Sequence, residues 1–329
     1  MNSLCDLVVA AESRIRPFVR ETFLEQATWL NRRGTSVYCK CENLQYTGSF
    51  KVRGAMNKLL SLTIKERKRG VVAASTGNHG AAVAFGLKVL GVQGIVFVPE
   101  RADAVRIKAI RKQGAEVRRY GDDPVLTEIH ARRFAAKKGM IYLSPYNDLD
   151  VVAGQGTIGV ELHRQLQHVD AIFASIGGGG LISGVASYLK TVNPRIKVFG
   201  CSPRNSDIMI RSVKAGRIVD APSLPTLSES TMGGIEPDAI TFNFCHSLVD
   251  HYITVTEGEI RDSLIKFMEN QHMLIEGAAA VSIAAYLRAA RNLAGMTVVI
   301  IICGANINAR TLNHILSKKR CPTKSSYIE

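Results

Sequence analysis

Short apolar runs alternate with amphipathic stretches through most of this chain of 329 residues. In the first half, apolar runs at 71–74, 95–98, 115–118 and 140–143 are separated by helical patterns at 79–90, 102–113 and 125–138. Short apolar runs that are bounded by turn residues are typical of buried strands. Strands and helices in strict alternation predict a parallel, doubly wound sheet.

A second series of the same kind follows. It comprises strands at 171–176, 197–200, 251–255 and 297–303, and helices at 181–190, 206–215, 257–270 and 276–290. Thr256 and Glu259 form a capping-box pattern at the start of one of these helices. Residues 220–237 are rich in proline, serine and glycine and are expected to form a long loop. We therefore predict an α/β protein with two doubly wound, mostly parallel sheets, flanking helices and a ligand cleft between two lobes.

Composition indicates an ordinary globular protein, since 46% of the residues are hydrophobic and 21% are charged. No apolar run reaches the roughly 18 residues that a bilayer span needs. The first residues include Asp6, Glu12 and Arg14, which do not suit a secretory leader. The seven cysteines are scattered and include no C-x-x-C pair. We therefore predict a cytoplasmic protein with reduced thiols and no membrane partner.

The net charge of +14 has two interpretations, a polyanion-binding surface or solvated helix faces. We favour the second, because cations suit the carboxyl ends of helices, where these clusters are expected to lie. No aromatic residues alternate with them, as they do in a single-strand binder, so no nucleic-acid partner is predicted. The clusters are 65–69, 111–112, 118–119, 132–133, 137–138 and 318–320.

The segment Ser-Phe-Lys-Val-Arg-Gly-Ala at 49–55 is the most informative part of the chain. It places Lys51 next to Phe50, at an expected boundary between a loop and a helix. A single lysine is normally solvated and indicates nothing. Two glycine-containing loops further along have the chemistry to hold an aromatic phosphate cofactor, and together with Lys51 they indicate an enzyme that bonds covalently to such a cofactor.

Four consecutive glycines connect the predicted strand at 171–176 to the predicted helix at 181–190. They are Gly177, Gly178, Gly179 and Gly180, and Leu181 follows them. Glycines let the backbone approach a phosphate closely, and the first turn of a helix presents unpaired N–H groups. A flexible surface loop is the alternative, but the flanking strand and helix argue against it. The Gly-Lys-Ser/Thr ending of a nucleotide P-loop is absent, so the phosphate is not expected to belong to a nucleoside triphosphate.

A second turn from a strand to a helix follows residues 71–74. Its residues are Ser75, Thr76, Gly77, Asn78 and His79. Small polar groups and backbone donors in such a turn can bind a substrate carboxylate, with Asn78 available to a ring hydroxyl. Alternatively, Ser75 and Asn78 only cap the helix. His79 is either an acid or base, or a residue at the helix start whose backbone matters, and we favour the latter.

Residues 154–159 match the G-x-G-x-x-G pattern of dinucleotide-binding proteins. No strand is predicted before them, and no acidic residue follows at the right distance within a strand. We therefore expect these glycines to allow close helix packing, and a nicotinamide enzyme is disfavoured. Neither His-Glu-x-x-His nor G-x-S-x-G occurs, so protease and hydrolase functions have little support.

Segments 40–45 and 47–55 resemble the cofactor-lysine region of threonine/serine dehydratases, which are fold-type-II pyridoxal-phosphate enzymes. Similar counterparts in this family exist for 75–80, 177–180, 276–280 and 303–306, and the resemblance extends from about residue 15 to 310. It implies a fold similar to the tryptophan synthase β chain, with the cofactor in the interdomain cleft. It also implies a large domain of residues 1–47 plus 147–329 and a small inserted domain of residues 48–146 that carries the asparagine loop.

The resemblance favours the dehydratase–racemase branch, because Val52 stands where threonine and cysteine synthases generally have aspartate. Segments 74–80, 154–162 and 227–235 also resemble hydroxyectoine-utilisation dehydratases. Since about 20 residues follow Asn306, we expect no isoleucine-sensitive regulatory domain.

Serine racemases are similar too, but Ser202 and Ile208 stand where that family has carboxylates that bind a divalent metal. No metal site is therefore predicted. Thr76 takes the place of the serine that acts as second base in those racemases, so weak racemisation stays possible. Cys303 replaces the more usual serine beside the ring nitrogen.

The resemblance implies a role for each candidate residue. Lys51 holds pyridoxal 5'-phosphate covalently, Phe50 packs on its ring, Asn78 bonds the ring hydroxyl, Cys303 faces the ring nitrogen, Gly177 to Leu181 bind the phosphate, and Ser75 to His79 bind the substrate carboxylate. The implied reaction is β-elimination, in which L-threonine or L-serine loses water, and the resulting imine is then hydrolysed to a 2-oxo acid and ammonia. The alternatives are a dehydratase of a hydroxyectoine-derived amino acid, a serine racemase and a cofactor-free binding protein. A homodimer or homotetramer is expected.

Overall fold

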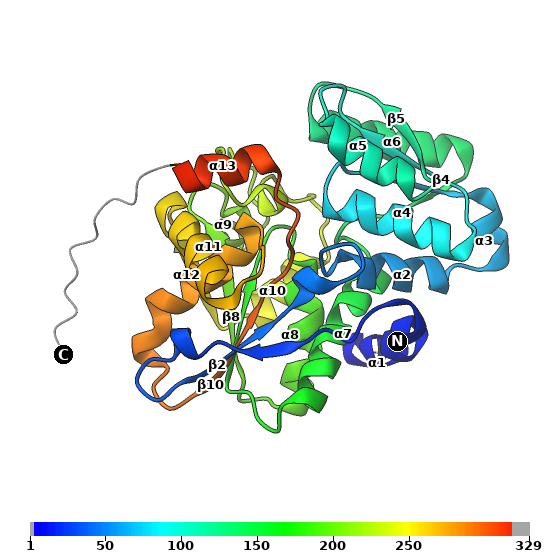
Figure 1. Cartoon of the computed structure of the whole chain (residues 1–329). Coiled ribbons are helices and arrows are strands. Elements are labelled where there is room, and N and C mark those ends of the chain that lie inside the picture. Colours follow the sequence, from blue (N-terminus) through cyan, green and yellow to red (C-terminus); the bar gives the residue numbers. More distant parts are fainter. Residues whose placement is uncertain (1–2, 318–329) are drawn as a thin grey trace.

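The computed structural model describes residues 3–317. Its strands form two sheets, which Figure 1 shows in two neighbouring lobes. The larger sheet has the order β1-β2-β10-β7-β8-β9, and only its edge pair β1-β2 is antiparallel. Its strands are β1 (Leu24–Gln26), β2 (Ser36–Lys40), β7 (Ala171–Ser175), β8 (Lys197–Pro203), β9 (His251–Val255) and β10 (Thr297–Ile301).

The smaller sheet has the order β5-β4-β3-β6 and is parallel throughout. Its strands are β3 (Val71–Ala74), β4 (Gly94–Val98), β5 (Glu116–Arg119) and β6 (Ile141–Tyr142). Successive side chains of β3 point to opposite faces, as in any strand. Val71 packs in one apolar cluster with residues of the helix that follows β3, and Val72 packs in another with Ala131. Helices therefore cover both faces of this sheet.

Thirteen helices surround the sheets within residues 3–317. Those of the first half are α1 (Leu4–Ile15), α2 (Lys51–Ser61), α3 (Ile64–Arg69), α4 (Asn78–Leu90), α5 (Ala104–Lys112) and α6 (Pro124–Lys138). The others are α7 (Leu149–Gln165), α8 (Gly180–Val192), α9 (Ile208–Ala215), α10 (Thr241–Leu248), α11 (Glu257–Gln271), α12 (Gly277–Ala289) and α13 (Ala309–Ser317). Over this described range, no helix combines the length and the apolar character that crossing a membrane requires.

The predicted fold class is confirmed, as are the strands and helices expected from the two alternating series, with ends that shift by a few residues. The capping box of Thr256 and Glu259 is also present. The two predicted series did not include α1, α3, α7, α10, α13, β1 or β2, although helix packing was expected at 154–159. All strands of the smaller sheet lie within 48–146 and all those of the larger sheet lie outside it, while the exact domain boundaries stay a prediction.

The positions expected for the basic clusters are partly wrong. Those at 65–69, 111–112 and 137–138 do lie in the last turns of α3, α5 and α6. In contrast, residues 118–119 belong to β5, an edge strand that is open to solvent on one side and so accommodates cations. Residues 132–133 lie inside α6, where Arg132 pairs with Glu128 one turn away. The cluster at 318–320 falls outside the described residues.

The glycines of the 154–159 pattern lie in the interior of α7, which confirms that they serve helix packing. A Cβ atom on Gly154 would lie 2.6 Å from the carbonyl oxygen of Arg53 in α2. On the side of α8, a Cβ on Gly156 would lie 2.7 Å from the carbonyl oxygen of Gly184. Because both neighbours are backbone atoms, α7 is held in close contact with α2 and with α8 at the same time.

A Gly184→Ala substitution tests this packing. The added Cβ would lie 2.2 Å from the carbonyl oxygen of Val152, so one of the two helices must move. We expect the free energy of unfolding, measured with urea, to fall by about 2 kcal/mol or more. The matched control is Gly258→Ala in α11, where the nearest atom would be 4.0 Å away and no loss is expected. Equal stability of the two variants would contradict close packing.

A cluster of four buried charges joins β2 and the turn after it to α2 and α7. The side chains of Lys40, Glu42, Arg53 and Glu161 are 0% exposed. Arg53 forms two hydrogen bonds to each carboxylate, at 2.8 and 2.8 Å to Glu42 and at 2.7 and 2.9 Å to Glu161. Lys40 Nζ lies 2.5 Å from Glu161. The two positive and two negative buried charges balance, and each is hydrogen-bonded, which makes their burial tolerable. The partly exposed Arg16 also pairs with Glu161 at 2.6 Å.

Glu161→Gln tests this cluster. Burial acts to raise the pKa of Glu161, but Arg53 and Lys40 outweigh burial and lower the pKa to about 2. Its carboxylate therefore stabilises the fold above the unfolded pKa of about 4.3, and this contribution is lost as the pH falls towards 2. We expect the variant to lose about 3–5 kcal/mol at pH 7 in urea unfolding, because it leaves buried cations with one anion fewer.

The stability difference between wild type and Glu161→Gln should shrink as the pH is lowered from 5 towards 3. Glu116→Gln is the control, since Glu116 pairs with Arg118 at the surface and should contribute little. A difference that is small at pH 7, or that does not change with pH, would contradict the role of the buried charges.

Candidate active site

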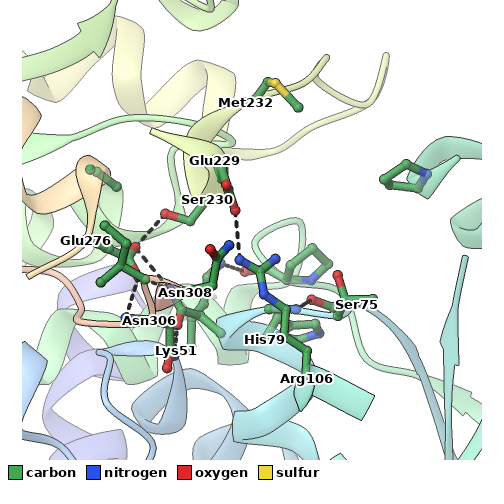
Figure 2. A pocket seen from close by; sticks show the side chains of 18 of the residues that line it. Lys51, Ser75, His79, Arg106, Glu229, Ser230, Met232, Glu276, Asn306 and Asn308 are labelled. Carbon is green, nitrogen blue, oxygen red and sulfur yellow. Dashed lines mark hydrogen bonds and ion pairs between the residues drawn. The ribbon is translucent and has the colours of Figure 1, made fainter. Parts of the chain in front are cut away.

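A cavity of about 280 Å³ opens where the loops after the small sheet face segments of the larger lobe (Figure 2). Lys51 from α2 and Arg106 from α5 line one side of it. The other lining segments include residues 74–79, 276–278 and 306–308. Ligands commonly bind at the carboxyl ends of parallel strands, and the loop after β3 lies at such an end.

Lys51 is the first residue of α2, and its side chain is partly buried. Its Nζ donates a hydrogen bond of 2.7 Å to the carbonyl oxygen of Pro145 and lies 5.2 Å from the centre of the Phe50 ring. Burial lowers its pKa to about 8, against the opposing effects of Cys303 and Glu276. A substantial share of the amine is thus neutral near physiological pH, and the neutral form is the nucleophile and the base.

The asparagine loop presents backbone donors rather than a capped helix end. The N-cap residue of α4 is Gly77, which has no side chain, and Ser75 Oγ instead accepts from the Gly77 N–H at 3.1 Å. The backbone N–H groups of Thr76, Asn78 and His79 find no acceptor in the described part of the chain. The capping interpretation of Ser75 and Asn78 is therefore wrong. The start of α4 instead offers free donors that suit an anion.

His79 is not suited to acid–base chemistry at neutral pH. It is 4% exposed, and its Nε2 lies 2.9 Å from the carbonyl oxygen of Leu143. Burial and then the charge of Lys51 lower its pKa to about 3. A neutral imidazole donates its Nε2–H to that carbonyl. This supports the interpretation in which the backbone of His79, rather than its ring, contributes to the site.

The four glycines form a packed loop between β7 and α8, not a flexible surface loop. Gly179 has a φ of +84°, in the left-handed region. A Cβ on Gly178 would lie 2.4 Å from the Tyr146 ring, and one on Gly180 would lie 3.0 Å from Tyr146 Cβ. Among residues 3–317, no group accepts from the backbone N–H groups of Gly177 to Leu181. The loop thus has the free donors that phosphate binding needs.

The predicted site residues fall into two groups. Lys51 and the residues from Ser75 to His79 line the cavity, whereas Phe50, Leu181, Cys303 and the glycine loop do not. Cys303 is 2% exposed, its carbonyl oxygen accepts from Phe50 N at 3.1 Å, and its Sγ is 3.5 Å from Ser175 Oγ. Pro145 contacts Lys51, and its neighbour Tyr146 contacts the glycines, so this pair connects the two groups.

A family model described as "Pyridoxal-phosphate dependent enzyme" matches residues 15–304, which is most of the chain. The chain belongs to this family of pyridoxal-phosphate dependent enzymes.

Curated relatives of this pyridoxal-phosphate dependent enzyme include L-threonine ammonia-lyase from Thermotoga maritima, which is 38% identical over 94% of this chain and 77% of the relative. The catabolic L-threonine dehydratase TdcB from Escherichia coli is 36% identical over 94% of this chain and 95% of its own. Among solved structures, maize serine racemase has a TM-score of 0.90 at 30% identity, and the match covers 96% of this chain and 97% of that chain.

The residues present fit the cofactor that the family name implies. Pyridoxal phosphate carries an aldehyde, an aromatic ring and a phosphate. The partly neutral Lys51 amine suits the aldehyde, and the unpaired N–H groups of Gly177 to Leu181 suit the phosphate.

Four residues of this pyridoxal-phosphate dependent enzyme contribute to the cavity without having been assigned a role from the sequence. They are Arg106, Glu229, Ser230 and Glu276. Arg106 Nη2 and Glu229 Oε2 form an ion pair of 2.8 Å across the cavity (Figure 2). Glu276 accepts from Ser230 and from Asn78. The resemblance included segment 276–280, but nothing in the local sequence shows that Glu276 contacts Ser230 and Asn78, which are distant along the chain.

The protonation state of His79 can be measured. Because its folded pKa is lowered to about 3 while the unfolded value is near 6.5, its imidazole should stay neutral as the pH falls from 8 to 5. The His79 ring resonances, assigned by their loss in His79→Gln, should not move over this range in nuclear magnetic resonance spectra.

The same His79→Gln variant should lose less stability than the wild type between pH 7 and pH 5, because only an unfolded His79 takes up a proton there. A titration of His79 near pH 6.5 would contradict the buried geometry.

Proposed function

We propose that this enzyme is an ammonia-lyase that eliminates water from a β-hydroxy amino acid such as L-threonine or L-serine, and that hydrolysis of the resulting imine takes one water back and releases a 2-oxo acid and ammonia. The observation that carries the proposal is the Lys51 amine, whose pKa is lowered to about 8 and which lines one cavity with the free backbone donors of Thr76, Asn78 and His79. The names of the threonine ammonia-lyase and dehydratase relatives support the same reaction.

In this proposal, the start of α4 binds the substrate carboxylate through its backbone N–H groups, and this orients the α-carbon towards Lys51. Lys51 Nζ removes the α-proton in its neutral form, which a pKa of about 8 makes available. The carbonyl oxygen of Pro145 accepts a hydrogen bond from Nζ and so holds the amine in place before and after the proton arrives. When bound, pyridoxal phosphate supplies the electron sink that stabilises the resulting carbanion.

We also propose that Phe50, Asn78, Cys303 and residues 177–181 hold the cofactor as the family resemblance implies. Burial raises the pKa of the Cys303 thiol, which therefore stays neutral. A neutral thiol beside a ring nitrogen cannot hold that nitrogen protonated as a carboxylate would. This favours prompt loss of the β-hydroxyl over reversible transamination. A cytoplasmic homodimer or homotetramer remains our expectation.

Racemisation of serine is the second candidate function. The overall similarity to maize serine racemase supports it, with a TM-score of 0.90. Thr76 also lines the cavity, and its hydroxyl has no partner within the described residues, so it is available as a second base. Chiral analysis of serine after incubation separates the two functions, and racemisation through Thr76 should disappear in Thr76→Ala.

A Lys51→Ala substitution tests the lyase proposal. We expect release of 2-oxo acid from L-threonine and L-serine to fall to background, because no other residue replaces the amine that bonds to the cofactor and takes the α-proton. The visible absorption band of the protein loaded with cofactor, which borohydride bleaches in the wild type, should also be lost. Lys65→Ala is the matched control, since Lys65 is exposed on α3, and it should keep both signals.

A screen of β-hydroxy amino acids, including 3-hydroxyaspartate and a hydroxyectoine-derived diamino acid, identifies the preferred substrate. A protein that binds the cofactor but releases no 2-oxo acid from any of them would refute the lyase proposal.

A further inference from the structure

The carboxylate of Glu276 is buried in the cavity wall without a role in the reaction proposed above. Glu276 is 4% exposed and immediately precedes α12, and its backbone N–H donates to the carbonyl oxygen of Gly304 at 3.0 Å. Gly304 makes room for the carboxylate, because a Cβ there would lie 2.9 Å from Glu276 Oε2. A buried carboxylate without partners would be costly, so its surroundings indicate what it does.

Every hydrogen-bonding partner of this carboxylate donates to it. Asn78 Nδ2 lies 3.1 Å from Oε1 and 2.9 Å from Oε2 of Glu276, Ser230 Oγ lies 2.6 Å from Oε1, and the backbone N of Asn306 lies 3.1 Å from Oε2. Burial raises the pKa of Glu276, and the donors Ser230, Asn78 and Asn306 oppose this. A set made only of donors matches the ionised carboxylate, which can only accept.

These contacts determine which way the Asn78 amide points. A side-chain amide can rotate by 180° and exchange its oxygen and nitrogen. Here Glu276 accepts from Nδ2 on one side, and Asn306 Nδ2 donates to Oδ1 on the other. After rotation, the Asn78 oxygen would face the carboxylate and its NH₂ group would face that of Asn306, so both interactions would become repulsive. The ionised Glu276 therefore favours one orientation strongly.

Both contacts of Asn78 Nδ2 go to the two oxygens of one carboxylate, so one hydrogen shared between these oxygens can make both and the other hydrogen stays available. The amide nitrogen carries two hydrogens. Within residues 3–317, Glu276 is the only acceptor for Nδ2. Since Asn78 and Glu276 both line the cavity that contains the Lys51 amine, the second hydrogen is free for a ligand bound there.

We propose that Glu276 is a positioning residue that holds the Asn78 amide so that Nδ2 can donate to the cofactor. Figure 2 marks hydrogen bonds from Glu276 to Ser230 and to Asn306, which belong to segments of the larger lobe, whereas Asn78 starts α4, the helix after β3 of the small sheet. Glu276 thereby links the donor to the larger lobe as well. The proposal rests on the cofactor that the family implies and not on the choice of substrate.

A double-mutant cycle on cofactor binding tests the proposal. The dissociation constant of pyridoxal phosphate is measured by absorbance titration of the cofactor-free wild type and of the variants Glu276→Gln, Asn78→Ala and the double variant. Each single substitution should weaken binding by about tenfold, as for the loss of one hydrogen bond. The double variant should bind within about twofold of Asn78→Ala, because Glu276 acts through Asn78. Both singles should shift the absorption maximum of the bound cofactor in the same direction.

Two further variants complete the test. Glu25→Gln removes an exposed carboxylate from β1 and should leave the dissociation constant unchanged. Glu276→Asp keeps the charge and should recover part of the cofactor affinity that Glu276→Gln loses. If circular dichroism shows that Glu276→Gln does not fold, Glu276→Asp takes its place in the cycle.

Two results would overturn the proposal. One is unchanged cofactor affinity in the folded Glu276 variant, and the other is a loss that is as large in the Asn78→Ala background as in the wild type. Because the titration needs no substrate, a protein that passes this test and releases no 2-oxo acid would disprove the lyase function alone.

Discussion

Arg53 donates two hydrogen bonds to each of two buried carboxylates, and these bonds set the position of α2. The site depends on α2 because this helix begins with Lys51. Lys51 precedes Arg53 by two residues, so the two side chains leave α2 on different sides, one into the cavity and one into the charge cluster. Arg53 donates to Glu161, which lies on α7, and glycines also bring α2 and α7 into backbone contact. A lysine at position 53 could not replace the planar fork. The position of the Lys51 amine therefore depends on a buried charge cluster that does not line the cavity.

Local sequence patterns could predict the helices and strands that pack against segments nearby in the sequence. The strands of the small sheet were found because helices cover both faces and every residue of β3 is apolar. β2 was missed, since it ends on Lys40, whose burial makes sense only with Glu161, 121 positions further along the chain. α7 was missed because its three glycines lower helix propensity. The close contacts with α2 and α8 that require them exist only in the folded protein.

The site shows the same division. The lysine segment and the two loops that join strands to helices were predicted, because a strand, small residues and a helix start encode an anion site within about ten residues. Glu276 could not be assigned from sequence, since its partners Asn78 and Ser230 are 198 and 46 positions away. Nor could local sequence show that Tyr146 packs against the glycines, because the turn after β6 and the loop after β7 are separated by α7 along the chain and meet only in the folded protein.

The charges around the cavity explain why one amine can act as both nucleophile and base. Burial keeps the His79 imidazole and the Cys303 thiol neutral, Glu276 is surrounded by donors, and Arg106 is paired with Glu229. In the proposed reaction, the backbone donors at the start of α4 would bind the substrate carboxylate, and they bring no full positive charge close to Lys51. A carboxylate bound there would raise the pKa of Lys51 above its value of about 8. Before the substrate binds, the lower pKa of Lys51 would leave more of the amine neutral and nucleophilic. Once the substrate carboxylate is bound, the higher pKa would make the amine a stronger base for the α-proton.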